Sequence, residues 1–197
     1  MKYKASKMLK QSRFKDCVKT LTNEEYYITL KYVNKLIDEN KEYTDKQNYG
    51  YLCNLFVSMS LVWMHMEKGK TKIDSQKIVF DAMHKYLKPK VKSMQNLAKH
   101  KFFVPMLKKI MPIKIKKQCG YGWDIVFPKT SKYKFSMTTN KCIFAQIFEK
   151  YGMKEMTKGF CLVDNLMYSE LPHTKFSYSQ RIGEGGSFCD YSFERED

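Results

Sequence analysis

The chain has 197 residues, of which 43% are hydrophobic, 15% aromatic and 28% charged. This composition excludes a disordered, collagen-like or low-complexity chain, and the length suits a single domain that needs neither a disulfide nor a metal to fold. The net charge is +16, but only three of the 36 basic residues are arginine, the residue with which nucleic-acid readers make bidentate contacts.

The positive charge is also unevenly distributed. Residues 140–197 carry seven basic and nine acidic residues, a balance of −2, so residues 1–139 carry the whole excess. We therefore expect a small-molecule partner rather than nucleic acid, and leave a homo-oligomer open.

Residues 1–111 are predicted to be mainly helical. Thr22 and Glu25 form a capping-box pattern ahead of an apolar stripe. The apolar segment 51–66 falls short of about 20 apolar residues, so it predicts a buried helix rather than a membrane span. Asp74 is expected to cap a third helix, and Pro89 to begin a fourth.

Residues 112–197 are predicted to form a hairpin, two helices and a second hairpin. The expected segments are two alternating strands at 123–127 and 133–137, a helix that Thr139 or Asn140 caps, a helix at 160–171, and strands at 176–178 and 189–193. The fold class is therefore α+β, a single domain over residues 1–197. In it, an N-terminal helical layer packs with a roughly four-stranded antiparallel sheet and two further helices.

The cysteine pattern favours a reducing compartment. No pair has CxxC spacing, and no export or membrane signal is visible, which predicts a cytoplasmic protein with free thiols and no membrane partner. The six cysteines are Cys17, Cys53, Cys119, Cys142, Cys161 and Cys189.

Two of these thiols are placed on helices. Cys142 is expected in the first turn of its helix beside Lys141, where the helix N-terminus and the cation favour a thiolate; the alternative is a small buried hydrophobe. Cys161, Asp164 and Tyr168 fall on one helical face. The thiol and carboxylate are therefore a nucleophile with a proton carrier, two metal ligands, or a core cysteine beside a carboxylate that caps or pairs locally.

Cys189 and Asp190 are neighbours on the last predicted strand. Their side chains therefore point to opposite faces of the sheet, and Cys189 shares its face with Tyr191. Only one of the two can line a given pocket directly.

No resident cofactor is expected. Cys142, Cys161 and Cys189 are separated by 18 and 27 residues, which is not zinc-finger spacing, although folding can bring distant ligands together. If the protein binds zinc, these three thiols are the predicted ligands.

Arg181 precedes a glycine segment, 183–186, that lies between two predicted strands. The segment is interpreted as a hairpin turn rather than a phosphate loop. Arg181 is a candidate for holding a substrate carboxylate, with a surface ion pair to Glu184 or Glu194 as the alternative.

Taken in order, these motifs resemble one family. They are Thr138-Thr139-Asn140-Lys141-Cys142, Phe160-Cys161-Leu162-Val163-Asp164, Arg181-Ile182-Gly183 to Gly186, and Cys189-Asp190-Tyr191-Ser192-Phe193. The pattern resembles the L-2-amino-thiazoline-4-carboxylic acid hydrolase family, and the motifs cover about residues 120–195.

The resemblance implies a hydrolase that opens a cyclic amidine or thiazoline ring with water to give an N-carbamoyl amino acid. It suggests Cys161 or Cys142 as nucleophile, with Cys189 also in the site, and Asp164 or Asp190 as proton carrier. Arg181 and Tyr168 would bind the substrate. The alternative is a non-catalytic module of the same fold that binds a small ligand or a metal in a cysteine-lined pocket.

Overall fold

The computed structural model of the protein describes residues 3–196 and divides into two compact units. The first unit extends to Tyr86 and the second begins at Leu87. Helix α5 (Lys72–Ala98) runs through this boundary. Each unit is described on its own.

The first unit is helical. Its elements are α1 (Ala5–Gln11), α2 (Lys15–Lys19), α3 (Asn23–Glu39), the short 3₁₀ helix η1 (Lys41–Tyr43), α4 (Tyr49–Glu67) and the first part of α5. The predicted capping box is confirmed, because Thr22 Oγ1 accepts the Glu25 amide and the Glu25 carboxylate accepts the Thr22 amide. As predicted, the apolar segment forms a buried helix, with Leu55, Phe56 and Met59 fully buried on α4.

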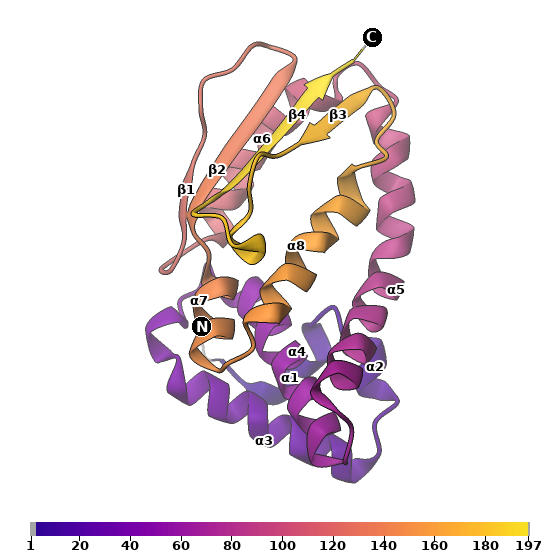
Figure 1. Cartoon of the computed structure of the whole chain (residues 1–197), viewed down its shortest axis with the longest axis vertical. Coiled ribbons are helices and arrows are strands. Elements are labelled where there is room, and N and C mark those ends of the chain that lie inside the picture. Colours follow the sequence, from indigo (N-terminus) through magenta and orange to yellow (C-terminus); the bar gives the residue numbers. More distant parts are fainter. Residues whose placement is uncertain (1–2, 197) are drawn as a thin grey trace. The chain divides into compact units, whose positions relative to one another are not determined.

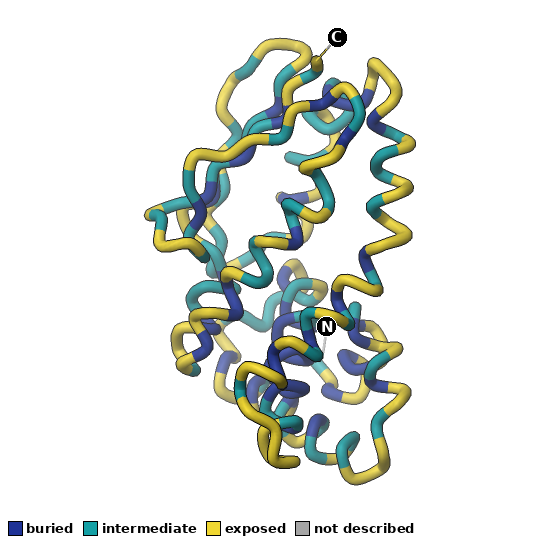
Figure 2. Tube along the Cα trace, turned by 45° about the vertical axis from the view of Figure 1, so that its right-hand side comes forward, coloured by how far each residue is buried: buried dark blue, intermediate teal, exposed yellow. Residues whose placement is uncertain are grey.

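The two long helices that follow differ from the prediction. Pro89 lies inside α5 instead of beginning a helix, and Pro112 lies inside α6 (Phe103–Gln118) instead of ending it. Past Leu87, α5 has no buried residue before Ala98, as its yellow and teal course shows (Figure 2). At Pro89 only one backbone hydrogen bond is lost, on an exposed stretch, and the helix continues because Met94 and Leu97 pack, partly buried, against the core of the second unit.

The second unit adds the sheet and two short helices. Its remaining elements are β1 (Asp124–Val126), β2 (Lys134–Lys141), α7 (Ile143–Lys150), α8 (Lys154–Tyr168), β3 (Thr174–Ser177), the 3₁₀ helix η2 (Ile182–Glu184) and β4 (Cys189–Arg195). The four strands are antiparallel in the order β1-β2-β4-β3 (Figure 1). The predicted α+β class and four-stranded antiparallel sheet are confirmed.

One face of this sheet is apolar and covered by helices. Phe135 on β2 pairs with Phe193 on β4, and both pack in a core to which α6 contributes Phe103 and Val104. On the opposite face, the hydroxyls of Ser136 and Ser192 lie 3.2 Å apart. The alternation along β4 therefore sends Cys189 toward the core, as predicted.

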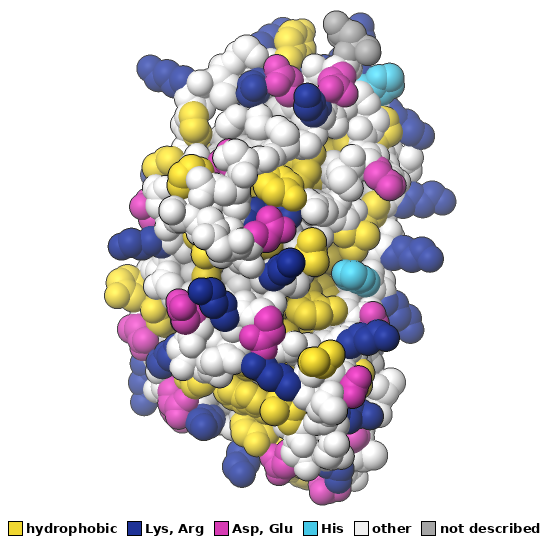
Figure 3. Space-filling view, viewed as in Figure 1, with side chains coloured by type: hydrophobic (Ala, Val, Ile, Leu, Met, Phe, Trp, Pro, Cys, Tyr) yellow, Lys and Arg dark blue, Asp and Glu magenta, His cyan; other side chains and the backbone are white. Residues whose placement is uncertain are grey.

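The surface is rich in lysine along α5, whose side chains project from the right-hand edge of the space-filling view (Figure 3). Within residues 3–196, no helix combines the length and the apolar character needed to cross a membrane.

Candidate functional site

Four of the predicted site residues come together in the second unit. Cys161 hydrogen-bonds with Cys189, and the charges of Cys142, Asp164 and Cys189 all act on the Cys161 thiol. We call Cys142, Cys161, Asp164 and Cys189 the thiol cluster. Its members come from four places in the chain: the residue before α7, two positions on α8, and the first residue of β4.

Local and long-range structure both contribute to bringing the residues of the thiol cluster together. Cys161 and Asp164 share a face of α8 because they are three residues apart. Thr139 on β2 pairs with Cys189 on β4, so the chain leaves β2 close to Cys189 and reaches Cys142 three residues later. The predicted position of Cys142 is corrected slightly. It is the N-cap of α7, because β2 extends through Lys141 instead of ending before Thr139.

The 3₁₀ helix η2 touches both members of the sulfur pair. The Ile182 amide donates to Cys189 Sγ at 3.2 Å. A Cβ on Gly183 would lie 2.8 Å from Cys161 Sγ and 3.0 Å from the backbone of α8, so no side chain fits at this position. The glycine segment was predicted to be a simple hairpin turn, and the structure corrects this. Gly183 permits close packing on α8, and Gly185, at φ 92°, makes the turn.

The hydrogen bonds of this pair shift the pKa values of the two thiols in opposite directions. The bond from the Cys161 thiol lowers the pKa of Cys189 to about 7, helped by the Ile182 amide and the Tyr191 hydroxyl and opposed by burial. The same bond and burial raise the pKa of Cys161. Burial raises the pKa of Tyr191 as well. The arrangement thus favours a thiolate on Cys189 with a proton held on Cys161.

Cys142 does not become an activated thiol. Burial raises its pKa to about 12, and the amides of Ala145 and Phe144 at the start of α7 offset this only in part. Of the two interpretations of Cys142, this favours the small hydrophobe over the activated thiol, because desolvation outweighs the helix N-terminus here.

Arg181 is fully buried next to the cluster. Its guanidinium carbon lies 3.5 Å from the Tyr178 ring centre and 5.5 Å from that of Tyr191. Nη2 donates to Asn165 Oδ1 at 2.5 Å, and Nη1 lies 3.9 Å from Glu184 Oε1. Nε and Nη1 have no hydrogen-bond partner. The ion pair with Glu184 that was expected as the alternative is therefore present, although Arg181 is buried instead of lying at the surface. Two donor atoms without hydrogen bonds still leave the guanidinium suited to bind a carboxylate.

Two predicted site residues lie elsewhere. The Asp190 carboxylate points to the other face of β4 and accepts the amides of Ser179 at 2.8 Å and Gln180 at 3.0 Å. Burial opposes these bonds, yet they lower the pKa of Asp190. Tyr168 lies in the aromatic core, with its ring 5.1 Å from that of Phe193.

Two contributors to the site, Asn165 and the amide of Ile182, are not among the residues predicted from the sequence. Asn165 lies four residues after Cys161, so its helical spacing was a usable signal. Nothing in the sequence marked the Ile182 amide, because a backbone donor carries no residue type.

The structure gives no support to zinc at the thiols. Across residues 3–196, no group of three or more His, Cys, Asp or Glu side chains is arranged to hold a metal ion. All six cysteines are free.

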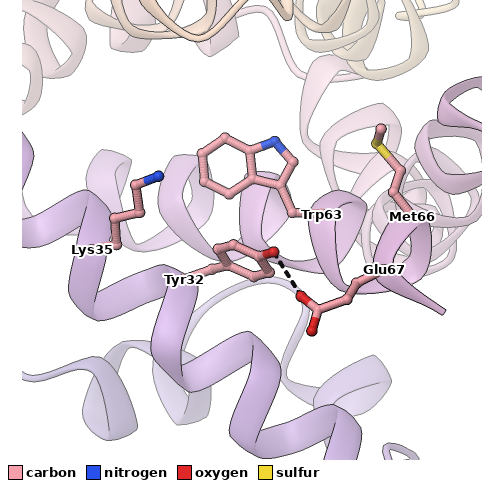
Figure 4. A pocket seen from close by; sticks show the side chains of 5 residues that line it. All are labelled: Tyr32, Lys35, Trp63, Met66 and Glu67. Atoms are coloured by element: carbon pink, nitrogen blue, oxygen red, sulfur yellow. Dashed lines mark hydrogen bonds between the residues drawn. The ribbon is translucent and has the colours of Figure 1, made fainter.

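A surface cavity of about 490 Å³ lies in the first unit, and none of the predicted site residues lines it. It is lined by Tyr32 and Lys35 of α3 and by Trp63, Met66 and Glu67 of α4 (Figure 4). The Tyr32 hydroxyl donates to Glu67 Oε2 at 2.7 Å, and Lys35 Nζ lies 5.9 Å from the Trp63 ring centre. The lining polar groups thus already interact with one another, and no nucleophilic thiol is among them.

Comparison with known families identifies one family for the chain. The sequence profile of the L-2-amino-thiazoline-4-carboxylic acid hydrolase family matches residues 56–193, a span that includes the whole cluster and Arg181. The chain belongs to this family. The hydrolase family name gives the class of function, and no curated protein matches the chain.

Two solved structures are similar to the chain at low identity. The Fe(II) unliganded H-NOX protein from K. algicida is 15% identical, with 99% of this chain and 97% of that chain covered and a TM-score of 0.35. A point mutant of the same H-NOX protein is 12% identical over 86% of this chain and 96% of that chain, with a TM-score of 0.31. Likeness at these scores carries no argument about this hydrolase-family member.

Proposed function

We propose that this chain is a hydrolase that opens the ring of a 2-amino-thiazoline carboxylate or a related cyclic amidine, with Cys189 as the nucleophile. The observation that carries the proposal is the hydrogen-bonded Cys161–Cys189 pair beside the buried, incompletely partnered guanidinium of Arg181. The family name supports the reaction class. The six free cysteines are consistent with a reducing cytoplasm as the place where it acts.

The first half of the reaction uses the proton distribution of the pair. The Cys189 thiolate attacks C2 of the ring, and the bond from C2 to the ring sulfur breaks. Cys161, which holds the proton of the pair, gives it to the departing sulfur. The product of this step is an isothiourea linked through Cys189.

The second half restores the enzyme. Water attacks C2 and the bond from C2 to Cys189 breaks, which regenerates the thiolate. One water proton passes by way of Asp164 to Cys161, and the other ends on the amidine nitrogen. The product is an N-carbamoyl amino acid with a free thiol, and every atom of the water is accounted for.

Arg181 gives this site its preference for an acid. A substrate carboxylate would accept a hydrogen bond from Nε, which has no hydrogen-bond partner, and at Nη1 it would take the place of the Glu184 carboxylate, now 3.9 Å away. The substrate class is therefore a small anionic ring rather than a neutral one.

The test uses the reduced protein, L-2-amino-thiazoline-4-carboxylate and ¹⁸O-labelled water. Mass spectrometry is expected to find N-carbamoyl-cysteine with one labelled oxygen, and the carboxamide analogue of the substrate, the matched neutral control, to react much more slowly. Retention of one equivalent of unchanged ligand, detected by equilibrium dialysis, would instead indicate the non-catalytic module. If the protein neither turns over nor binds any cyclic amidine carboxylate, the proposal is rejected.

A further inference from the structure

The two sulfurs of the Cys161–Cys189 pair are held together by one short segment. Ile182 contacts Cys189 Sγ through its amide, and Gly183, the next residue, lies against Cys161 Sγ. Consecutive residues of η2 therefore contact one sulfur each, and the sulfurs are already in hydrogen-bond contact. The segment therefore holds the two sulfurs next to each other, which a disulfide between them requires.

The pair also has the asymmetry that thiol oxidation requires. Cys189 accepts hydrogen bonds from the Ile182 amide and from the Cys161 thiol, and both stabilise its thiolate form. Cys161 keeps its proton and is half-buried, whereas Cys189 is 5% exposed. An attacking thiolate beside a second thiol is the arrangement of a redox-sensitive pair.

We propose that Cys161 and Cys189 form a redox modification site, which hydrogen peroxide converts to a disulfide and a thiol reductant restores. The Cys189 thiolate attacks one peroxide oxygen, the O–O bond breaks, and the other oxygen leaves as water once it is protonated. Cys161 then attacks the sulfenic sulfur and a second water leaves. The two thiols are oxidised and the peroxide is reduced, so no further reactant is needed.

The disulfide would do more than consume the proposed nucleophile. It would join α8 to the first residue of β4 and fix the contact that η2 now spans. This inference goes beyond the proposed function because it concerns the reactivity of the pair alone and needs no substrate.

Cys142 is the competing partner. Its charge acts on Cys161 and the charge of Cys189 acts on it, so it lies in the same cluster. Its pKa is raised, however, and η2 contacts the sulfurs of the other two cysteines. We expect it to stay reduced while the other two react.

The experiment treats the reduced full-length protein with one to a few equivalents of H₂O₂ and maps its peptides by mass spectrometry. The expected result is a peptide pair joined through Cys161 and Cys189, lighter by two hydrogen atoms and separated again by a reductant. A disulfide through Cys142, or oxidation of Cys17 and Cys119 while Cys161 and Cys189 stay reduced, would overturn the proposal.

Two variants sharpen the outcome. Cys161→Ser is expected to stop at a sulfenic acid on Cys189, heavier by one oxygen atom and trapped by dimedone; Cys142→Ser is expected to cross-link as the unchanged chain does. A Cys161→Ser protein that forms no sulfenic acid on Cys189 would contradict the assignment of the attacking thiol. Because mass is the readout, the result stands whether or not the thiazoline substrate is turned over.

Discussion

Two buried cysteines, one in each unit, are nearly equal in exposure and opposite in character. Cys53 on α4 is 3% exposed and Cys189 on β4 is 5% exposed. Burial raises the pKa of Cys53 to about 11, and hydrogen bonding led by the Cys161 thiol lowers that of Cys189 to about 7.

The difference lies in the donors around each sulfur. Cys53 has a hydrogen bond from Tyr49, one turn earlier on the same helix, and this does not compensate for desolvation. Cys189 has donors from α8, η2 and its own strand. Burial alone therefore gives an inert thiol, and convergence of separate elements on one sulfur gives a reactive one.

Replacing each cysteine by alanine should give the largest difference between Cys189 and Cys53. Cys189→Ala is expected to lower kcat/KM for the thiazoline carboxylate by at least ~10³-fold, because the nucleophile is lost. Cys53→Ala should leave kcat/KM within about twofold and instead cost about 1–2 kcal/mol in the free energy of unfolding. Equal activities of the two variants would exclude Cys189 as the nucleophile.

The guanidinium of Arg181 should control substrate choice. Arg181→Lys keeps a positive charge but loses the planar fork, so kcat/KM for the carboxylate should fall about 10- to 100-fold, mostly through KM. The carboxamide analogue should be much less affected, and Arg13→Lys in the first unit should change neither. An equal loss with both substrates would show that Arg181 does not hold the carboxylate.

Two glycines test the packing of η2. Gly183→Ala should cost about 1–3 kcal/mol in the free energy of unfolding in urea, because its Cβ meets Cys161 Sγ and the backbone of α8. Gly50→Ala on α4 has open space and should stabilise the first unit by up to about 1 kcal/mol. A tolerated Gly183→Ala would mean that η2 does not lie this close to α8.

Two carboxylates should give the smallest effects. The folded-state pKa of Asp190 is below its ordinary value of 3.8, so its bonds stabilise the fold above that pH, and this contribution is lost as pH falls through the lowered value. Asp190→Asn should cost about 1 kcal/mol at neutral pH and remove that part of the acid dependence. Asp16→Asn should change nothing measurable, since Asp16 pairs with Lys19 on the surface. Acid unfolding curves that coincide for Asp190→Asn and the unchanged chain would contradict this role of Asp190.

The features that could be predicted from the sequence are mostly local. The capping box at Thr22, the two hairpins and the Cys161–Asp164 face each depend on residues close together in the chain. Pro89 and Pro112 misled the prediction because a proline marks a helix boundary only where packing does not hold the helix together.

The chemistry of the site could be predicted only in part. Residue types identified the three thiols, but which of them is a thiolate depends on the β2–β4 register and on the Ile182 amide, which are long-range features. The burial of Arg181 could not be predicted from the sequence either, because a charged residue is ordinarily exposed.

The most direct test of this contrast is the rate of alkylation of Cys189 and Cys53 by iodoacetamide as pH is raised from 5 to 10, followed by mass spectrometry of the two peptides. The thiolate fraction rises with pH, so Cys189 should gain reactivity around pH 7 and Cys53 should stay unlabelled until the pH is far higher. Matching profiles for the two cysteines, or labelling of Cys53 first, would contradict the claim that converging donors, rather than burial, set the chemistry of the site.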